Sequence, residues 1–218
     1  MTRASGILFD GQLGVANRNT LIARGRRLEY FTLAWNGFEA AVALIAGLLA
    51  GSIALVGFGL DSVFETASAG ILLWRLGADA DVRHREYTER IARRLVGVCF
   101  LLLALYVTVA SVHALWTRAH PERSLPGILI AAAAVMVMPL LGRAKRQVAA
   151  QLGSGALRAD SRQADFCAWL SAILLAGLLL QTLLGWWWAD SAAALVMVPI
   201  IAREGAQGLR GERCDECA

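Results

Sequence analysis

Two acidic residues, Asp61 and Glu65, have side chains and a spacing suited to binding a metal ion. They are four positions apart in an otherwise apolar stretch, so on a helix both carboxylates lie on one face, with Cβ atoms about 5–6 Å apart. Two carboxylates this close repel each other unless a cation or a proton lies between them. The pair is predicted to supply half of a divalent metal site. The alternative is a pair of buried or protonated acids that bond to neighbouring helices.

The start of the fifth long apolar stretch carries a second set of polar residues. At about 100° per residue, one helix face holds four of them, whereas Asp165 points nearly to the opposite side. The four are Asp160, Gln163, Cys167 and Ser171. Gln163 and Cys167 repeat the four-residue spacing of the acidic pair. A thiolate favours zinc, cadmium or copper(I) over magnesium or calcium, so Cys167 is predicted as a ligand or else as an ordinary buried residue. Asp165 is the rival ligand if this helix is rotated or broken.

Other polar residues offer further ligands. Glu39 lies within the first apolar stretch and is predicted either as a third carboxylate ligand or as a proton carrier. Asp190 lies close to the outer membrane interface, where helix capping or an arginine partner is the expected role. The tail Cys214-Asp-Glu-Cys217 has the spacing of half a structural zinc site. Three roles are open for this tail: it transfers metal to the transport path, it forms a redox pair, or it has no role.

The composition predicts that the elements positioning these residues are transmembrane helices. Of the 218 residues 57% are hydrophobic and only 17% are charged, against about 25% charged in a soluble domain. A spanning helix needs about 20 mostly apolar residues, so an all-α, polytopic membrane protein is expected, with glycine hairpin turns at 50–52 and 184–185. The six predicted spans are 29–50, 53–76, 92–117, 125–142, 162–184 and 187–203.

The basic residues predict that both termini are cytoplasmic. With the N-terminus inside, only Arg118 and Arg123 fall outside, which leaves nineteen of the 21 lysines and arginines on the cytoplasmic side. The arginines and Lys145 lie in the gaps between apolar runs, so nucleic-acid binding is not expected. No removable signal peptide is evident, and no nucleophile–base set or cofactor motif suggests an enzyme. Arginine- and alanine-rich usage suggests a bacterial cytoplasmic membrane.

Residues 51–65 resemble the second helix of cation diffusion facilitator transporters, in which a Ser-x-Ala-Leu run leads to a His- or Asp-x-x-x-Asp metal pair. In that register Asp61 and Glu65 take the two ligand positions. Residues 159–167 are similar to the family's Ala-Asp-Ala-x-His-x-x-x-Asp, but Gln163 and Cys167 replace the histidine and the aspartate. The family's tetrahedral zinc site is therefore not carried over intact.

The resemblance covers residues 28–207 and implies a short, divergent member. It implies a six-helix domain over 28–207, between a cytoplasmic arm at 1–27 and a tail at 208–218, without the soluble C-terminal domain usual in the family. It also implies a homodimer that exports divalent metal from the cytoplasm in exchange for protons, through a mid-membrane site. Zinc is the first candidate substrate, with iron, manganese, cobalt and cadmium open. The alternative is a non-transporting metal sensor or partner subunit.

Overall fold

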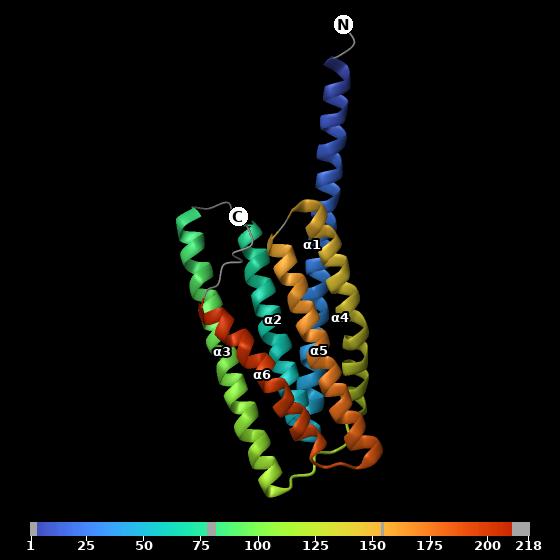
Figure 1. The fold of residues 1–218 in the computed structure, drawn as a ribbon, viewed down its shortest axis with the longest axis vertical. Coiled ribbons are helices and arrows are strands. Elements are labelled where there is room, and N and C mark those ends of the chain that lie inside the picture. Colours follow the sequence, from blue (N-terminus) through green and yellow to red (C-terminus); the bar gives the residue numbers. More distant parts are fainter. Residues whose placement is uncertain (1–3, 78–81, 154, 211–218) are drawn as a thin grey trace.

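The computed structural model describes residues 4–77, 82–153 and 155–210, and over these ranges it is helical, with no strand. The helices lie side by side as a bundle (Figure 1). They are α1 (Ala4–Ala50), α2 (Ile53–Gly77), α3 (Val82–Thr117), α4 (Leu125–Leu152), α5 (Gly155–Leu184) and α6 (Ala189–Arg210). The predicted all-α fold is confirmed.

The helices are long and apolar enough to make this a polytopic membrane protein. Five stretches meet the length and hydropathy expected of a membrane span: Asn19–Ala50, Gly97–Thr117, Leu125–Leu152, Asp160–Leu184 and Ala189–Leu209. The remaining helix, α2, has 25 residues, which is also enough to cross about 30 Å of hydrocarbon. Large apolar side chains such as Leu49 and Trp116 are exposed on the outside of the bundle, as a lipid environment requires.

Several helices are longer than the apolar runs that predicted them. The fourth was expected to end at 142, but α4 continues to Leu152 and ends at Gly153, which adopts a left-handed conformation. The expectation that Lys145 lies in a loop was therefore wrong. Likewise α1 begins at Ala4 rather than 29, and α3 begins at Val82 rather than 92. The physical reason is that hydropathy marks the part of a helix in lipid, whereas polar residues extend the same helix into water.

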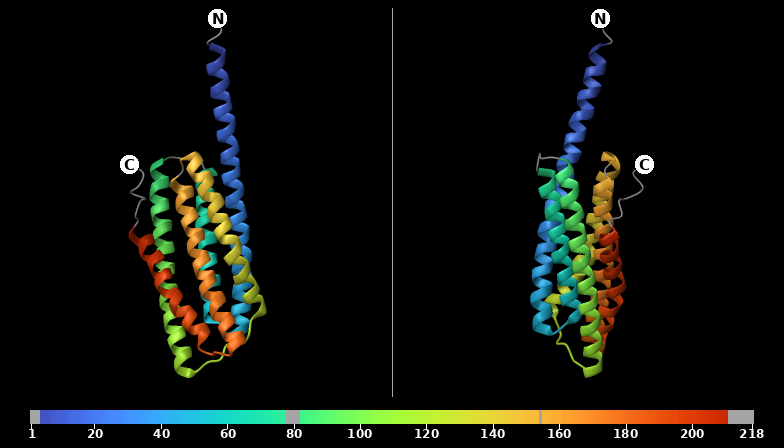
Figure 2. Two further views of the ribbon diagram at one scale, coloured as in Figure 1. Left: turned by 45° about the vertical axis from the view of Figure 1, so that its right-hand side comes forward. Right: turned by 90° about the vertical axis from the view of Figure 1, so that its left-hand side faces the viewer.

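Tight turns join two antiparallel helix pairs, as predicted. Gly51 joins α1 to α2 with φ of 66°, and Gly185 lies between α5 and α6 with φ of 68°. This left-handed region is open to glycine at no steric cost. Because six helices alternate in direction, the beginning of α1 and the end of α6 lie toward the same end of the bundle (Figure 2).

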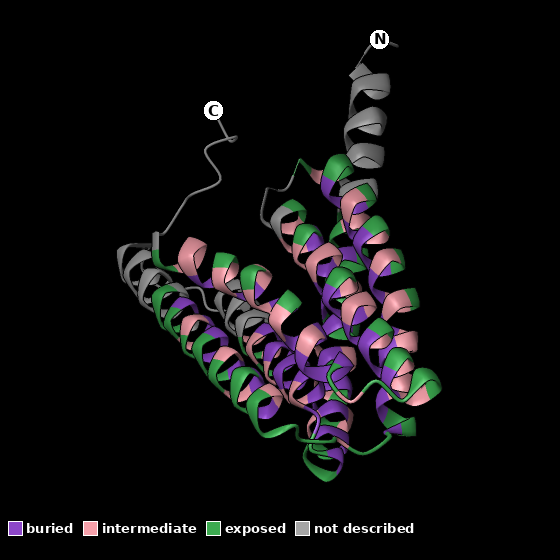
Figure 3. Ribbon diagram, turned by 60° about the horizontal axis from the view of Figure 1, so that its bottom comes forward, coloured by how far each residue is buried: buried purple, intermediate pink, exposed green. Residues whose placement is uncertain are grey.

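The helices pack as a bundle of four with a pair along its side. α1 contacts α2 and α4, α4 contacts α5, and α3 and α6 contact each other extensively. Gly97 of α3 and Gly205 of α6 let the backbones of these two helices come close together, since a Cβ atom at Gly97 would lie 2.8 Å from the Gly205 carbonyl oxygen. Buried residues face inward between the helices (Figure 3), and Phe58 of α2 is among the largest that are fully buried.

Candidate metal site

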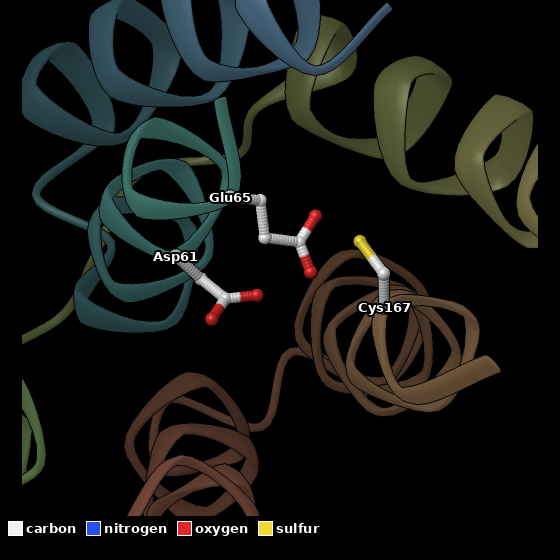
Figure 4. Close-up of side chains that lie close together, drawn as sticks. All are labelled: Asp61, Glu65 and Cys167. Atoms are coloured by element: carbon white, nitrogen blue, oxygen red, sulfur yellow. The ribbon is translucent and has the colours of Figure 1, made fainter. Parts of the chain in front are cut away.

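Three side chains of types that can bind a metal ion meet between α2 and α5. Asp61 and Glu65 project from consecutive turns of α2, and Cys167 faces them from α5 (Figure 4). One ligand atom from each lies within 4.8 Å of the others, and all three side chains are buried. The helical period thus places the acidic pair on one face, as predicted. Two carboxylate oxygens and a sulfur at this separation can surround a single cation.

Amide groups from two further helices hold the Glu65 carboxylate. The Asn36 side-chain amide of α1 donates from Nδ2 to Glu65 Oε2 over 3.0 Å. The Gln163 amide of α5 donates from Nε2 to Glu65 Oε1 over 2.8 Å. Gln163 therefore orients a carboxylate of the cluster in this structure. Because both donors are neutral, they fix the position of Glu65 without cancelling its charge.

Glu39 of α1 lies beside the cluster and is completely buried. Its Oε1 accepts a hydrogen bond of 2.8 Å from the Ser62 hydroxyl, and its Oε2 accepts one of 2.7 Å from the Trp35 indole nitrogen. The Cys167 thiol also donates to Glu39 Oε1, with sulfur and oxygen 3.8 Å apart. Glu39 thus contacts one member of the cluster directly, while other donors hold both of its oxygens.

Two oxygen atoms in this region are buried without a hydrogen-bond partner. They are Asp61 Oδ2 and Asn36 Oδ1, and both residues are only 2% exposed. Buried oxygens are nearly always paired with a donor in folded proteins. One of these oxygens belongs to the carboxylate–thiol cluster and the other to the residue that holds Glu65, and both have the chemistry of ligands for a cation.

A comparison with models of known protein families identifies the family of this chain. The model for the cation efflux transmembrane domain matches residues 30–210. The chain belongs to the cation efflux family. The match includes every residue of the cluster and all six helices in whole or in part. Members of this family are transporters rather than enzymes.

Two curated proteins are similar over parts of this cation efflux chain. One is transmembrane protein 163 of Xenopus laevis, 30% identical over 107 residues, which cover 46% of this chain and 37% of the relative. The other is an uncharacterized transporter, sll1263, of Synechocystis sp., 27% identical over 153 residues, which cover 67% of this chain and 49% of the relative. The chain therefore spans half or less of the length of these relatives.

The structure of the cation efflux domain brings together five of the six predicted site residues, in one small region. They are Asp61, Glu65, Gln163, Cys167 and Glu39. It does not bring Asp165 to them. The Asp165 carboxylate pairs with the guanidinium of Arg146 on α4, and both side chains are partly exposed. Because α5 is unbroken from Gly155 to Leu184, the rotated or broken helix that would place Asp165 in the site does not occur.

Asp190, at the start of α6, has the capping role predicted for it. Its Oδ2 accepts a hydrogen bond of 2.9 Å from the backbone nitrogen of Ile53, the first residue of α2. Its Oδ1 accepts a hydrogen bond from the Ser52 hydroxyl. Asp190 thus caps a helix other than its own. Cys214 and Cys217 lie outside the residues that the structure describes.

Sequence reasoning missed one buried charged cluster in the domain. Lys145 of α4 is 0% exposed, and its Nζ lies 3.3 Å from Glu29 Oε2 of α1 and pairs with Asp160 Oδ2 of α5. The available signal was composition, because Lys145 is the single lysine of the sequence. A helix-face argument applied to Asp160 also favoured an inward position. The partner on α1 follows only from the packing of the helices.

Proposed function

We propose that the protein is a divalent metal cation transporter whose substrate binds to Asp61, Glu65 and Cys167. The observation that carries this proposal is the buried cluster itself, in which two carboxylates and a thiol from facing helices approach within 4.8 Å. Membership of the cation efflux family supports transport of the bound ion. Gln163 and Asn36 hold Glu65 in place, and Glu39 contacts Cys167.

Zinc is the proposed substrate because the cluster mixes sulfur with oxygen. A thiolate favours zinc and cadmium, whereas an all-oxygen site favours manganese, magnesium and calcium. A zinc site of three protein ligands also leaves a fourth position for water or another donor. Such a site releases its ion more readily than a closed structural site of four protein ligands, and release is necessary for transport. Iron, cobalt, manganese and cadmium are the competing substrates that an assay must include.

Metal and protons compete for the same atoms in the proposed cycle. Metal binding requires ionised carboxylates and an ionised thiol, so protons leave as the metal binds. Protons that reach the site from outside then displace the metal. The result is metal–proton exchange that exports metal from the cytoplasm. The distribution of basic residues supports placing both termini in the cytoplasm, and the arginine- and alanine-rich usage supports a bacterial cytoplasmic membrane. We expect a homodimer, as the family resemblance implies.

The test is zinc flux in proteoliposomes with an imposed pH gradient and a zinc indicator inside the vesicles. Wild type is expected to move zinc, and Asp61→Asn is expected to abolish the flux while eluting as a folded protein. The matched control is Asp165→Asn, which makes the same neutral replacement in α5 at a residue outside the cluster, and it should retain flux.

The outcomes separate the proposal from its alternative. Zinc binding by wild type without flux supports a sensor or partner subunit. Absence of flux for zinc, iron, manganese, cobalt and cadmium alike refutes the transporter. Equal flux in wild type and Asp61→Asn refutes the assignment of the substrate site.

A further inference from the structure

The buried cluster of Glu29, Lys145 and Asp160 joins three helices outside the metal site. Lys145 belongs to α4 and pairs with Glu29 of α1, at 3.3 Å between Nζ and Oε2, and with Asp160 of α5. Lysine is almost never fully buried unless it is paired, and here it is 0% exposed. Two acidic side chains meet one ammonium in this cluster.

The position of this cluster relates it to the path of the metal. Asp160 precedes Gln163 by one turn on the same face of α5, and Glu29 precedes Asn36 by two turns on α1. At about 1.5 Å per residue, the cluster lies about 5–10 Å along the helices from the residues that hold Glu65. It lies toward the end of the bundle where α1 begins, the end predicted to face the cytoplasm. These polar side chains of α1 and α5 therefore lie between the region of the metal site and that of Lys145.

An ion-pair cluster at this place suits a contact that must open. Replacing a buried ion pair by apolar side chains of similar volume is often neutral or stabilising, so stability alone does not account for burying these charges. Charged groups differ from apolar groups in a second way, because water stabilises them when they separate. In a closed state the charged groups are paired and buried, and in an open state they are separated and hydrated. Two such states are of similar free energy, as alternating access requires.

We propose that Lys145 is the gating residue between the cytoplasm and the metal site. In the closed state its ammonium holds Glu29 of α1 and Asp160 of α5 together. In the open state the pairs separate, water reaches the site, and the two freed carboxylates attract the incoming cation. The role as a metal gate rests on the proposed transport function. The closure of the bundle by these ion pairs does not depend on transport, and it can be measured without any metal.

The measurement is the reactivity of the Cys167 thiol, which is 0% exposed. Cys99, Cys214 and Cys217 are replaced by serine so that Cys167 is the single thiol. Sealed membrane vesicles of inside-out and right-side-out orientation are treated with a membrane-impermeant, cationic methanethiosulfonate. Lys145→Met is expected to speed labelling from the cytoplasmic side by about tenfold, which corresponds to about 1.4 kcal/mol in the opening equilibrium. Lys145→Arg keeps the charge and should keep the protection.

A second variant keeps the proposal testable if Lys145→Met fails to fold. The triple replacement Glu29→Gln, Lys145→Met and Asp160→Asn leaves no unpaired charge in the closed state and no charge for water to stabilise in the open state, so it should slow cytoplasmic labelling below the wild-type rate. Labelling at or above the wild-type rate in the folded triple variant overturns the gate. Labelling that rises equally from both sides also overturns it, because that result indicates general loosening. Faster cytoplasmic labelling in a protein without metal flux upholds the gate and refutes the transport proposal separately.

Discussion

The close crossing of α3 and α6 predicts a loss of stability when one methyl group is added. A Cβ atom at Gly97 would lie 2.8 Å from the Gly205 carbonyl oxygen and 2.9 Å from the Leu209 backbone nitrogen. Both are backbone atoms, so the two helices must move apart. Overpacking costs about 1–3 kcal/mol, and contacts to backbone belong at the upper end. The gain from replacing glycine by alanine in a helix is about 0.5–1 kcal/mol. The net loss in free energy of unfolding for Gly97→Ala is about 2 kcal/mol.

The assay is thermal unfolding of the purified protein in detergent, with Gly37→Ala as the matched control. A Cβ atom at Gly37, in the middle of α1, meets nothing within 4 Å, so this variant has the helical gain without the clash. For a protein of this size a loss of about 2 kcal/mol lowers the Tm by about 4–8 °C. Gly37→Ala should unfold at or slightly above the wild-type temperature. The reasoning is refuted if Gly97→Ala unfolds at the same temperature as Gly37→Ala or above it.

Three further predictions concern the site and its support. Asn36→Leu removes a donor to Glu65 at similar volume and should weaken zinc binding about 10–100-fold by calorimetry; unchanged affinity would show that the amide has no part in positioning the carboxylate. Cys167→Ser exchanges sulfur for oxygen and should shift competition binding from cadmium and zinc toward manganese; an unaltered cadmium-to-manganese ratio would remove sulfur from the site. Asp190→Ala should lower the free energy of unfolding by about 1–2 kcal/mol through loss of the α2 cap, whereas Asp190→Asn should retain much of it; equal melting of the two variants would argue against the cap.

The sequence predicted the features that depend on helical period and on apolar run length. Asp61 and Glu65 share a face because they are four positions apart, and Cys167 faces inward whereas Asp165 faces α4. These are local properties of one helix, so an apolar run of about 20 residues and an angle per residue suffice to derive them. Gly51 likewise marks a turn by its own backbone preference.

The features that escaped prediction depend on which helices meet. Nothing local to α1 tells that Asn36 donates to Glu65 rather than to another helix. Lys145 was expected in a loop because a charge normally ends an apolar run. In the structure Glu29 and Asp160 from two other helices compensate that charge, so α4 continues through it. Compensation by distant residues is a tertiary property, and composition alone does not reveal it.

The cap that Asp190 places on α2 has a consequence for the order in which the chain is completed during synthesis. Ile53 at the start of α2 receives its partner from a residue 137 positions later. At about 5–20 residues per second, roughly 7–27 s pass between their appearance on the ribosome. During that interval α2 has only its local cap, in which the Ser52 hydroxyl oxygen accepts a hydrogen bond of 3.1 Å from the Leu55 backbone nitrogen. α6 is made after α1 to α5 and adds the Asp190 contacts to the start of α2, so a nascent chain that stops after α5 lacks them.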